Sequence, residues 1–99
     1  MQNRTISWDT VALKHFIAVI EYIARDSSQN AEKVRSEIIE KIEMLPANPE
    51  VFPPDKYKSN SNGLYRAFEL HRLRIAYHIS SDKIRILRVR HASREPQNY

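Results

Sequence analysis

The spacing of apolar residues changes once along this 99-residue chain, and that change constrains the fold more than any other feature. Between residues 9 and 45 apolar side chains recur every three or four positions, as in amphipathic helices. After residue 63 apolar and polar residues alternate, which is typical of half-buried strands. The sequence therefore predicts an α+β fold in which a helical half is followed by a strand half.

The helical half begins with a short strand. Residues Arg4 to Trp8 alternate and are rich in β-branched side chains, and Asp9 can cap a helix whose apolar stripe extends to Ala24. A polar break from Arg25 to Asn30 leads to a second helix, which runs to about Leu45 before Pro46. Three residues of the break are candidate N-caps: Ser27, Ser28 and Asn30. So short a connection favours an antiparallel helical hairpin.

The strand half is preceded by a long loop and forms a meander. Residues 46–63 hold four of the five prolines and the only glycine. Beyond them we expect three antiparallel strands: Leu64 to His71, Arg72 to Ile79 and Lys83 to His91. The helical hairpin is expected to cover one face of this sheet, and the other face is expected to be polar.

Within the last predicted strand the apolar phase changes between Ile86 and Leu87. A central strand covered on both faces would explain this change, and so would a β-bulge. The polar sheet face should carry Arg74 and His78, with the aperiodic tail from Ala92 to Tyr99 nearby.

Charge is divided unevenly between the two halves. Residues 1–50 hold 6 Lys and Arg against 8 Asp and Glu, a net charge of −2, whereas residues 51–99 hold 10 against 4, a net charge of +6. A one-sided cationic surface usually meets a polyanion, because neutralising phosphates releases counterions. Nucleic acid is therefore the leading partner class, although an acidic protein fits the same field.

Several absences narrow the possible functions. Without cysteine the chain has no disulfides, thiolate metal site or thiol chemistry, and it suits a reducing cytosol. The longest apolar stretch, Phe16 to Ile20, is far shorter than the roughly 20 residues of a membrane span. With a single glycine, no H-E-x-x-H and no paired catalytic carboxylates, no metal or other cofactor is expected. We expect a single cytoplasmic domain over residues 1–99.

Four segments carry a family resemblance: Trp8 to Leu13, YIARDS at Tyr22 to Ser27, RIAY at Arg74 to Tyr77, and ILRVRHASREPQNY at Ile86 to Tyr99. Across essentially its whole length the chain resembles the RelE/ParE superfamily of bacterial toxins from type II toxin-antitoxin systems. The resemblance implies a compact α+β toxin that a partner antitoxin neutralises. RelE-like members are ribosome-dependent endonucleases that cut mRNA, whereas ParE-like members inhibit DNA gyrase.

The resemblance also implies a set of site residues. RNA cleavage without a metal needs a base, an acid and cations that stabilise the phosphorane. The basic and tyrosine positions of the family match five residues: Arg66, Arg74, His91, Arg94 and Tyr99. Arg66 and Arg74 would hold phosphate and stabilise charge, His91 would act as acid or base, and Arg94 and Tyr99 would complete the site. The chain departs from the pattern at Phe68, where the RelE-like enzymes have a second basic residue.

Four further cations are expected to contact nucleic acid: Lys56, Lys58, Arg88 and Arg90. Each candidate has a structural alternative. The two arginines could be solvent-exposed strand residues or antitoxin contacts, His91 could be a hydrogen-bonded residue at a strand end, and Tyr99 could be a frayed terminus.

Three functions remain open at this point. The first, which is the leading hypothesis, is a metal-independent, ribosome-dependent mRNA endonuclease, with the ribosome and mRNA as partners. The second is a non-enzymatic ParE-like inhibitor of DNA gyrase, which helices of about 16 and 15 residues fit at least as well. The third is a basic domain that has lost toxicity and serves only as a binding module. In each of the first two cases a cognate antitoxin is expected, and the +6 half predicts that it is acidic.

Overall fold

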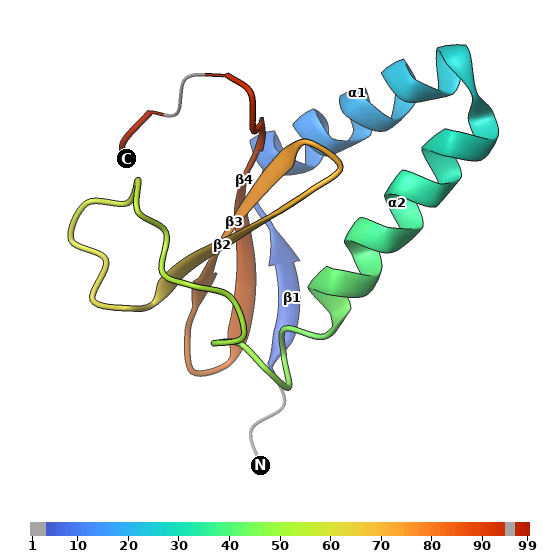
Figure 1. Cartoon of the computed structure of the whole chain (residues 1–99). Helices are drawn as coiled ribbons and strands as arrows, with labels where there is room; N and C mark the ends of the chain where they lie inside the picture. The colour runs from blue at the N-terminus through green and yellow to red at the C-terminus, as the bar shows by residue number, and fades with distance from the viewer. Residues whose placement is uncertain (1–3, 95–96) are drawn as a thin grey trace.

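The computed structural model describes residues 4–94 and 97–99, and it places two helices against one face of a four-stranded sheet (Figure 1). The elements follow in the order β1 Thr5–Trp8, α1 Thr10–Asp26, α2 Ser28–Glu43, β2 Tyr65–Leu70, β3 Leu73–Ile79 and β4 Lys83–His91. The strand order in the sheet is β1-β4-β3-β2. The predicted α+β fold, with an N-terminal strand, a helical hairpin and a three-stranded antiparallel meander, is confirmed.

The two helices are joined more tightly than the sequence predicts. The Asp9 carboxylate caps α1 by accepting hydrogen bonds from the backbone N–H groups of Val11 and Ala12, at 3.0 and 3.2 Å. Ser27 alone separates the helices, because it ends α1 and its hydroxyl accepts the N–H of Asn30 at the start of α2. The expected break over residues 25–30 was too long, since one extended residue is enough to reverse the chain. Likewise α2 ends at Glu43, before the predicted Leu45.

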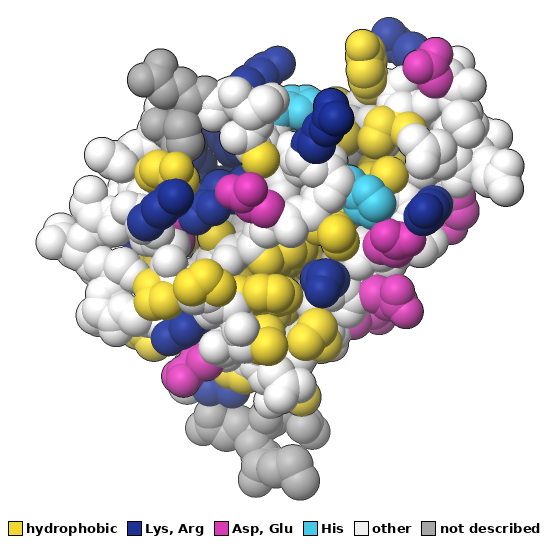
Figure 2. Space-filling model, viewed as in Figure 1, with side chains coloured by type: hydrophobic (Ala, Val, Ile, Leu, Met, Phe, Trp, Pro, Cys, Tyr) yellow, Lys and Arg dark blue, Asp and Glu magenta, His cyan; other side chains and the backbone are white. Residues whose placement is uncertain are grey.

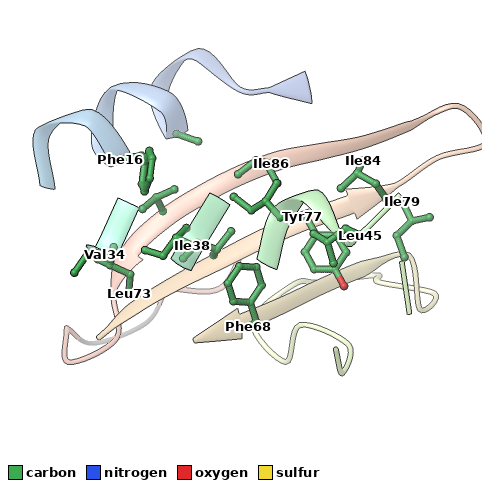
Figure 3. Packing of buried hydrophobic residues seen from close by; sticks show 14 residues of the cluster. Phe16, Val34, Ile38, Leu45, Phe68, Leu73, Tyr77, Ile79, Ile84 and Ile86 are labelled. Carbon is green, nitrogen blue, oxygen red and sulfur yellow. The ribbon is translucent and has the colours of Figure 1, made fainter. Parts of the chain in front are cut away.

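The hydrophobic core lies between the helices and the sheet. Figure 3 shows Phe16 of α1 and Ile38 of α2 on the side of the sheet that also carries Tyr77 and Ile86. All four are at most 5% exposed, and each such side chain contributes about 1.5–3 kcal/mol through burial. The Tyr77 hydroxyl donates to the Pro49 carbonyl at 2.8 Å, and burial raises the pKa of this phenol to about 12.

The fourth strand is central and contains a β-bulge. It pairs in parallel with β1, from Thr5 opposite Lys83 to Trp8 opposite Ile86, and antiparallel with β3 on its other side. Tyr77 lies opposite Ile86 but Ala76 lies opposite Arg88, so one extra residue interrupts the register at Leu87. The phase change in the sequence thus marks this bulge. A regular ladder would put Arg88 opposite Ile75, on the helix side, whereas the bulge turns Arg88 away from the helices.

The turn between β2 and β3 consists of His71 and Arg72, both with positive φ, at 53° and 64°. The predicted strands included these two residues, but a two-residue hairpin turn of this twist requires φ above zero at both positions. Both strands are correspondingly shorter than expected. The His71 ring lies 2.7 Å from a carboxylate oxygen of Glu37, which connects the hairpin tip to α2.

The long loop before β2 covers the outer edge of that strand. The backbone N–H of Asp55 donates to the Tyr65 carbonyl at 2.8 Å, and that of Ala67 donates to the Pro53 carbonyl at 3.3 Å. In the space-filling view hydrophobic side chains gather across the centre of the visible face, and Lys and Arg side chains surround them (Figure 2). In the described ranges no helix is both long and apolar enough to cross a membrane.

Candidate functional site

The sheet face opposite the helices, which we call the open face, carries alternate residues of three strands. They are Tyr65, Ala67 and Glu69 of β2, Arg74, Ala76 and His78 of β3, and Arg85, Arg88 and Arg90 of β4. The prediction that Arg74 and His78 lie on a polar face is confirmed. Part of this face is covered by the loop around Asp55 and by the C-terminal residue Tyr99.

A single buried carboxylate, Asp55, organises the open face. It is 3% exposed, and three donors reach it: the Arg74 guanidinium at 2.8 Å, the Tyr99 hydroxyl at 2.6 Å and the Tyr57 backbone N–H at 3.1 Å. Burial alone would raise the pKa of Asp55, but the hydrogen bonds from Tyr99, Arg74 and the backbone outweigh it and lower that pKa. Asp55 is therefore ionised, and its hydrogen bonds hold Arg74, Tyr99 and the Tyr57 backbone together.

The Arg74 guanidinium contacts a second carboxylate and an aromatic ring in addition to Asp55. Its second terminal nitrogen donates to Glu69 at 2.9 Å, and its plane lies 4.8 Å from the ring centre of Tyr57. Burial would lower the pKa of Arg74, but the two carboxylates raise it. The positive charge of Arg74 is thus matched by Asp55 and Glu69 within the protein itself.

The C-terminal residue Tyr99 is fixed by its ring, its hydroxyl and its backbone. Its ring centre lies 4.4 Å from the Arg88 guanidinium carbon and 5.2 Å from the Lys58 ammonium. Its backbone N–H donates to the Tyr57 carbonyl at 2.9 Å, and its carbonyl accepts from Ser59 at 2.7 Å. Burial and the neighbouring Asp55 carboxylate both raise the pKa of this phenol, so at neutral pH it is a hydrogen-bond donor.

A pocket of about 420 Å³ lies beside this network. Residues from α1 and β4 form its walls, among them His15 and Ala18 on the helix and Val89 on the strand. Of the residues predicted from the sequence, six line it: Arg74, Arg88, Arg90, His91, Arg94 and Tyr99. The structure therefore brings together most of the predicted site, although two of these side chains are committed to Asp55.

The remaining predicted residues lie elsewhere. Arg66 pairs with Tyr77 on the helix side of the sheet, where its guanidinium donates to the carbonyls of Phe52 and Gly63 at 2.8 and 3.1 Å. It thereby holds the long loop in place. The two lysines of that loop do not line the pocket: the Lys56 ammonium lies 5.2 Å from the ring centre of Tyr57, and Lys58 packs against Tyr99.

Sequence reasoning missed Asp55, Glu69 and Tyr57, which contact the predicted residues most closely. A signal for Asp55 was present, because it is the only acidic residue between positions 51 and 63 and it directly follows two prolines. An aspartate in such a place commonly accepts the N–H two residues later, as it does from Tyr57. Nothing in the spacing indicated that this carboxylate would be buried against β3.

Comparisons with known proteins define first the fold class and then the family. A chain of a solved structure described as a chromosomal ParDE TA system from P. aeruginosa has this fold, with a TM-score of 0.72 at 19% identity over 92% of this chain and 98% of that one. A family model described as ParE toxin of type II toxin-antitoxin system, parDE, matches residues 6–96. The chain belongs to this ParE toxin family, which confirms the resemblance to the RelE/ParE superfamily. No curated protein sequence matches it.

Proposed function

We propose that this toxin acts on DNA gyrase as a non-enzymatic inhibitor and does not cleave mRNA. Membership of the ParE family supports the gyrase target, since the resemblance of the sequence to ParE-like toxins implies that activity. The observation that carries the proposal is the buried Asp55 carboxylate, which takes up the Tyr99 hydroxyl and one side of the Arg74 guanidinium. An RNase of the RelE type would need both groups for its substrate.

The chemistry of RNA cleavage makes this argument concrete. A base must remove the 2′-hydroxyl proton, and cations must stabilise the phosphorane. The Tyr99 hydroxyl donates a hydrogen bond to Asp55, and its pKa is raised, so it stays protonated and cannot act as the base. Arg74 already faces two carboxylates, and Arg66 is directed to loop carbonyls on the other side of the sheet. Of the five predicted catalytic residues, His91 and Arg94 are left.

One observation favours mRNA cleavage as a second candidate. His91 and Arg94 line the same pocket as Arg90, and an imidazole is a common general acid or base in catalysis. A histidine-centred site would not need Tyr99 or Arg66. This candidate predicts cleavage that depends on His91, whereas the gyrase proposal does not.

The test compares two activities of the same purified samples. The wild-type toxin should inhibit supercoiling by purified gyrase. His91→Ala should inhibit it to within about twofold of the wild type, because a non-enzymatic inhibitor has no reacting group at this position. Primer extension on mRNA bound to ribosomes should show intact message with both proteins. His71→Ala, which removes a histidine that does not line the pocket, is the matched control. Message that is cut by the wild type and His71→Ala but not by His91→Ala, together with unaffected supercoiling, would overturn the proposal.

The partner that neutralises the toxin provides a further check. A chain of the ParE toxin family has an antitoxin as its partner. We expect the antitoxin, added in equal amount, to restore supercoiling in the same assay. Persistent inhibition in the presence of a bound antitoxin would show that the inhibiting surface and the antitoxin surface are separate.

A further inference from the structure

Two arginines on the open face carry charge that the described part of the protein leaves unmatched. Arg90 lies directly opposite Arg74 in the ladder, and Arg88 lies two residues away on the same face of β4. Like charges directly opposite each other destabilise a strand pair. Arg74 has Asp55 and Glu69 as ion-pair partners, but among residues 4–94 and 97–99 no carboxylate lies within ion-pair distance of Arg88 or Arg90.

The surroundings of Arg88 reinforce this imbalance. Burial and the neighbouring Arg90 charge both lower the pKa of Arg88. Its guanidinium donates to the Gln97 carbonyl at 3.1 Å and stacks on Tyr99, so it is held in one place rather than extended into solvent. The bulge at Leu87 is what puts both arginines on this face. An arrangement that concentrates and fixes positive charge favours an anion that spans both groups.

The spacing of these cations suits a nucleic-acid backbone. Residues two apart on a strand are about 6.7 Å apart. At this spacing two side chains on one face of a strand can each contact a separate phosphate of a nucleic-acid strand. Lys58 is a third cation close to Arg88, since both side chains contact the Tyr99 ring. Arg94 lines the same pocket as Arg88 and Arg90.

We propose that the open face binds the sugar–phosphate backbone of duplex DNA, with Arg88 and Arg90 as its central contacts and Lys58 at its flank. The choice of DNA rests on the proposed function, because DNA is the substrate that gyrase holds. The toxin then contacts the nucleic acid as well as the enzyme. Guanidinium groups suit repeated phosphates, each of which offers oxygen acceptors in the same geometry. Inhibition of gyrase should accordingly weaken as salt is raised.

The test is fluorescence anisotropy of the purified toxin with a labelled 20-base-pair duplex between 50 and 200 mM salt. Arg88→Gln/Arg90→Gln should bind at least about tenfold more weakly, and the slope of log affinity against log salt should fall by about 2. Lys14→Gln/Lys33→Gln removes the same charge from the helices and should bind within twofold of the wild type. Arg90→Gln alone, which leaves the contacts of Arg88 intact, should reduce the slope by about 1 and guards against misfolding of the double variant.

Three results would overturn the inference: no binding of the wild type to duplex DNA at 50 mM salt, equal loss in the helix control, or binding of single-stranded RNA or an acidic peptide tenfold tighter than duplex DNA. Supercoiling assays on the same samples separate the two proposals. Full gyrase inhibition by Arg88→Gln/Arg90→Gln would refute a role for DNA contact and leave the gyrase target standing. DNA binding by a wild-type protein that does not inhibit gyrase would refute the gyrase target alone.

Discussion

The two faces of the sheet are stabilised in different ways. On the helix side, side chains such as Ile38, Ile84 and Ile86 are wholly buried and contact one another over a large apolar area. On the open face one carboxylate, Asp55, takes hydrogen bonds from Arg74 and Tyr99 and closes the loop and the C-terminus onto the strands. The stability of the helix side is spread over many buried apolar residues, whereas the packing of the loop and Tyr99 on the open face depends on the charge of one residue, Asp55.

This difference decides how each face responds to change. The stability that a hydrophobic core provides changes little with pH or salt, because it does not depend on ionisable groups. A buried carboxylate stabilises the folded protein only while its hydrogen-bond donors are present and it remains ionised. The open face should therefore be sensitive to acid and to single polar substitutions. The helix face should be sensitive mainly to changes in the volume of its apolar side chains.

The largest effect is expected from a cavity on the helix side. Ile38→Ala removes a side chain with no exposed surface, and we expect the free energy of unfolding to fall by about 3–4 kcal/mol. Urea denaturation followed by circular dichroism measures this, with exposed Lys33→Ala on the same helix as the control. A loss below about 1 kcal/mol would mean that the two faces do not differ as described.

A smaller loss is expected from removing the charge on the open face. Asp55→Asn keeps the volume but weakens the bonds from Arg74 and Tyr99, at an expected cost of about 2 kcal/mol, reduced because Arg74 retains Glu69. Glu69 is 53% exposed at its side chain, so Glu69→Gln should cost less than about 0.5 kcal/mol. Equal effects of the two substitutions in urea denaturation would remove the special role of Asp55.

Acid should weaken the open face without any substitution. The pKa of Asp55 is lowered in the folded protein, whereas in the unfolded chain it is about 3.9. A lowered folded pKa contributes stability that is present above the unfolded value and is lost as pH falls through the folded one. We expect stability to decline from about pH 5 downward, and more steeply in the wild type than in Asp55→Asn. Parallel acid profiles would contradict this.

The smallest effect is expected at the β2–β3 turn, which belongs to neither face. Arg72 has φ at 64°, a conformation that glycine adopts without the cost of a Cβ. Arg72→Gly should raise the free energy of unfolding by about 0.5 kcal/mol. Arg25→Gly, in the last turn of α1, should lower it by about 0.5–1 kcal/mol. A loss in both variants would show that the turn carries no backbone strain.

The contrast between the faces also explains what could be predicted from the sequence. Periodicity identified both helices and the β4 strand, because burial of many apolar residues leaves a repeating pattern. It also marked the bulge at Leu87, which shifts the phase of that pattern. The parallel pairing of β1 with β4 leaves no such pattern, since it joins segments nearly 80 residues apart in the sequence.

The candidate site was harder to predict than the fold. The resemblance located Arg74, His91, Arg94 and Tyr99, which the structure brings to one pocket. Their partners were not predictable, because a single aspartate in a loop is usually exposed and its contact with Arg74 depends on the folding of residues 46–63. Arg66 was placed on the expected strand, but the side of the sheet it occupies depends on register.

The most direct test of the central claim uses Tyr99→Phe, which keeps the ring between Lys58 and Arg88 but removes the hydroxyl from Asp55. Inhibition of gyrase supercoiling would be measured per folded molecule, with urea denaturation of the same sample. If Tyr99 is a structural donor, stability should fall by about 1.5 kcal/mol while inhibition stays within twofold of the wild type. Unchanged stability together with loss of inhibition would contradict this and place the hydroxyl in the functional site.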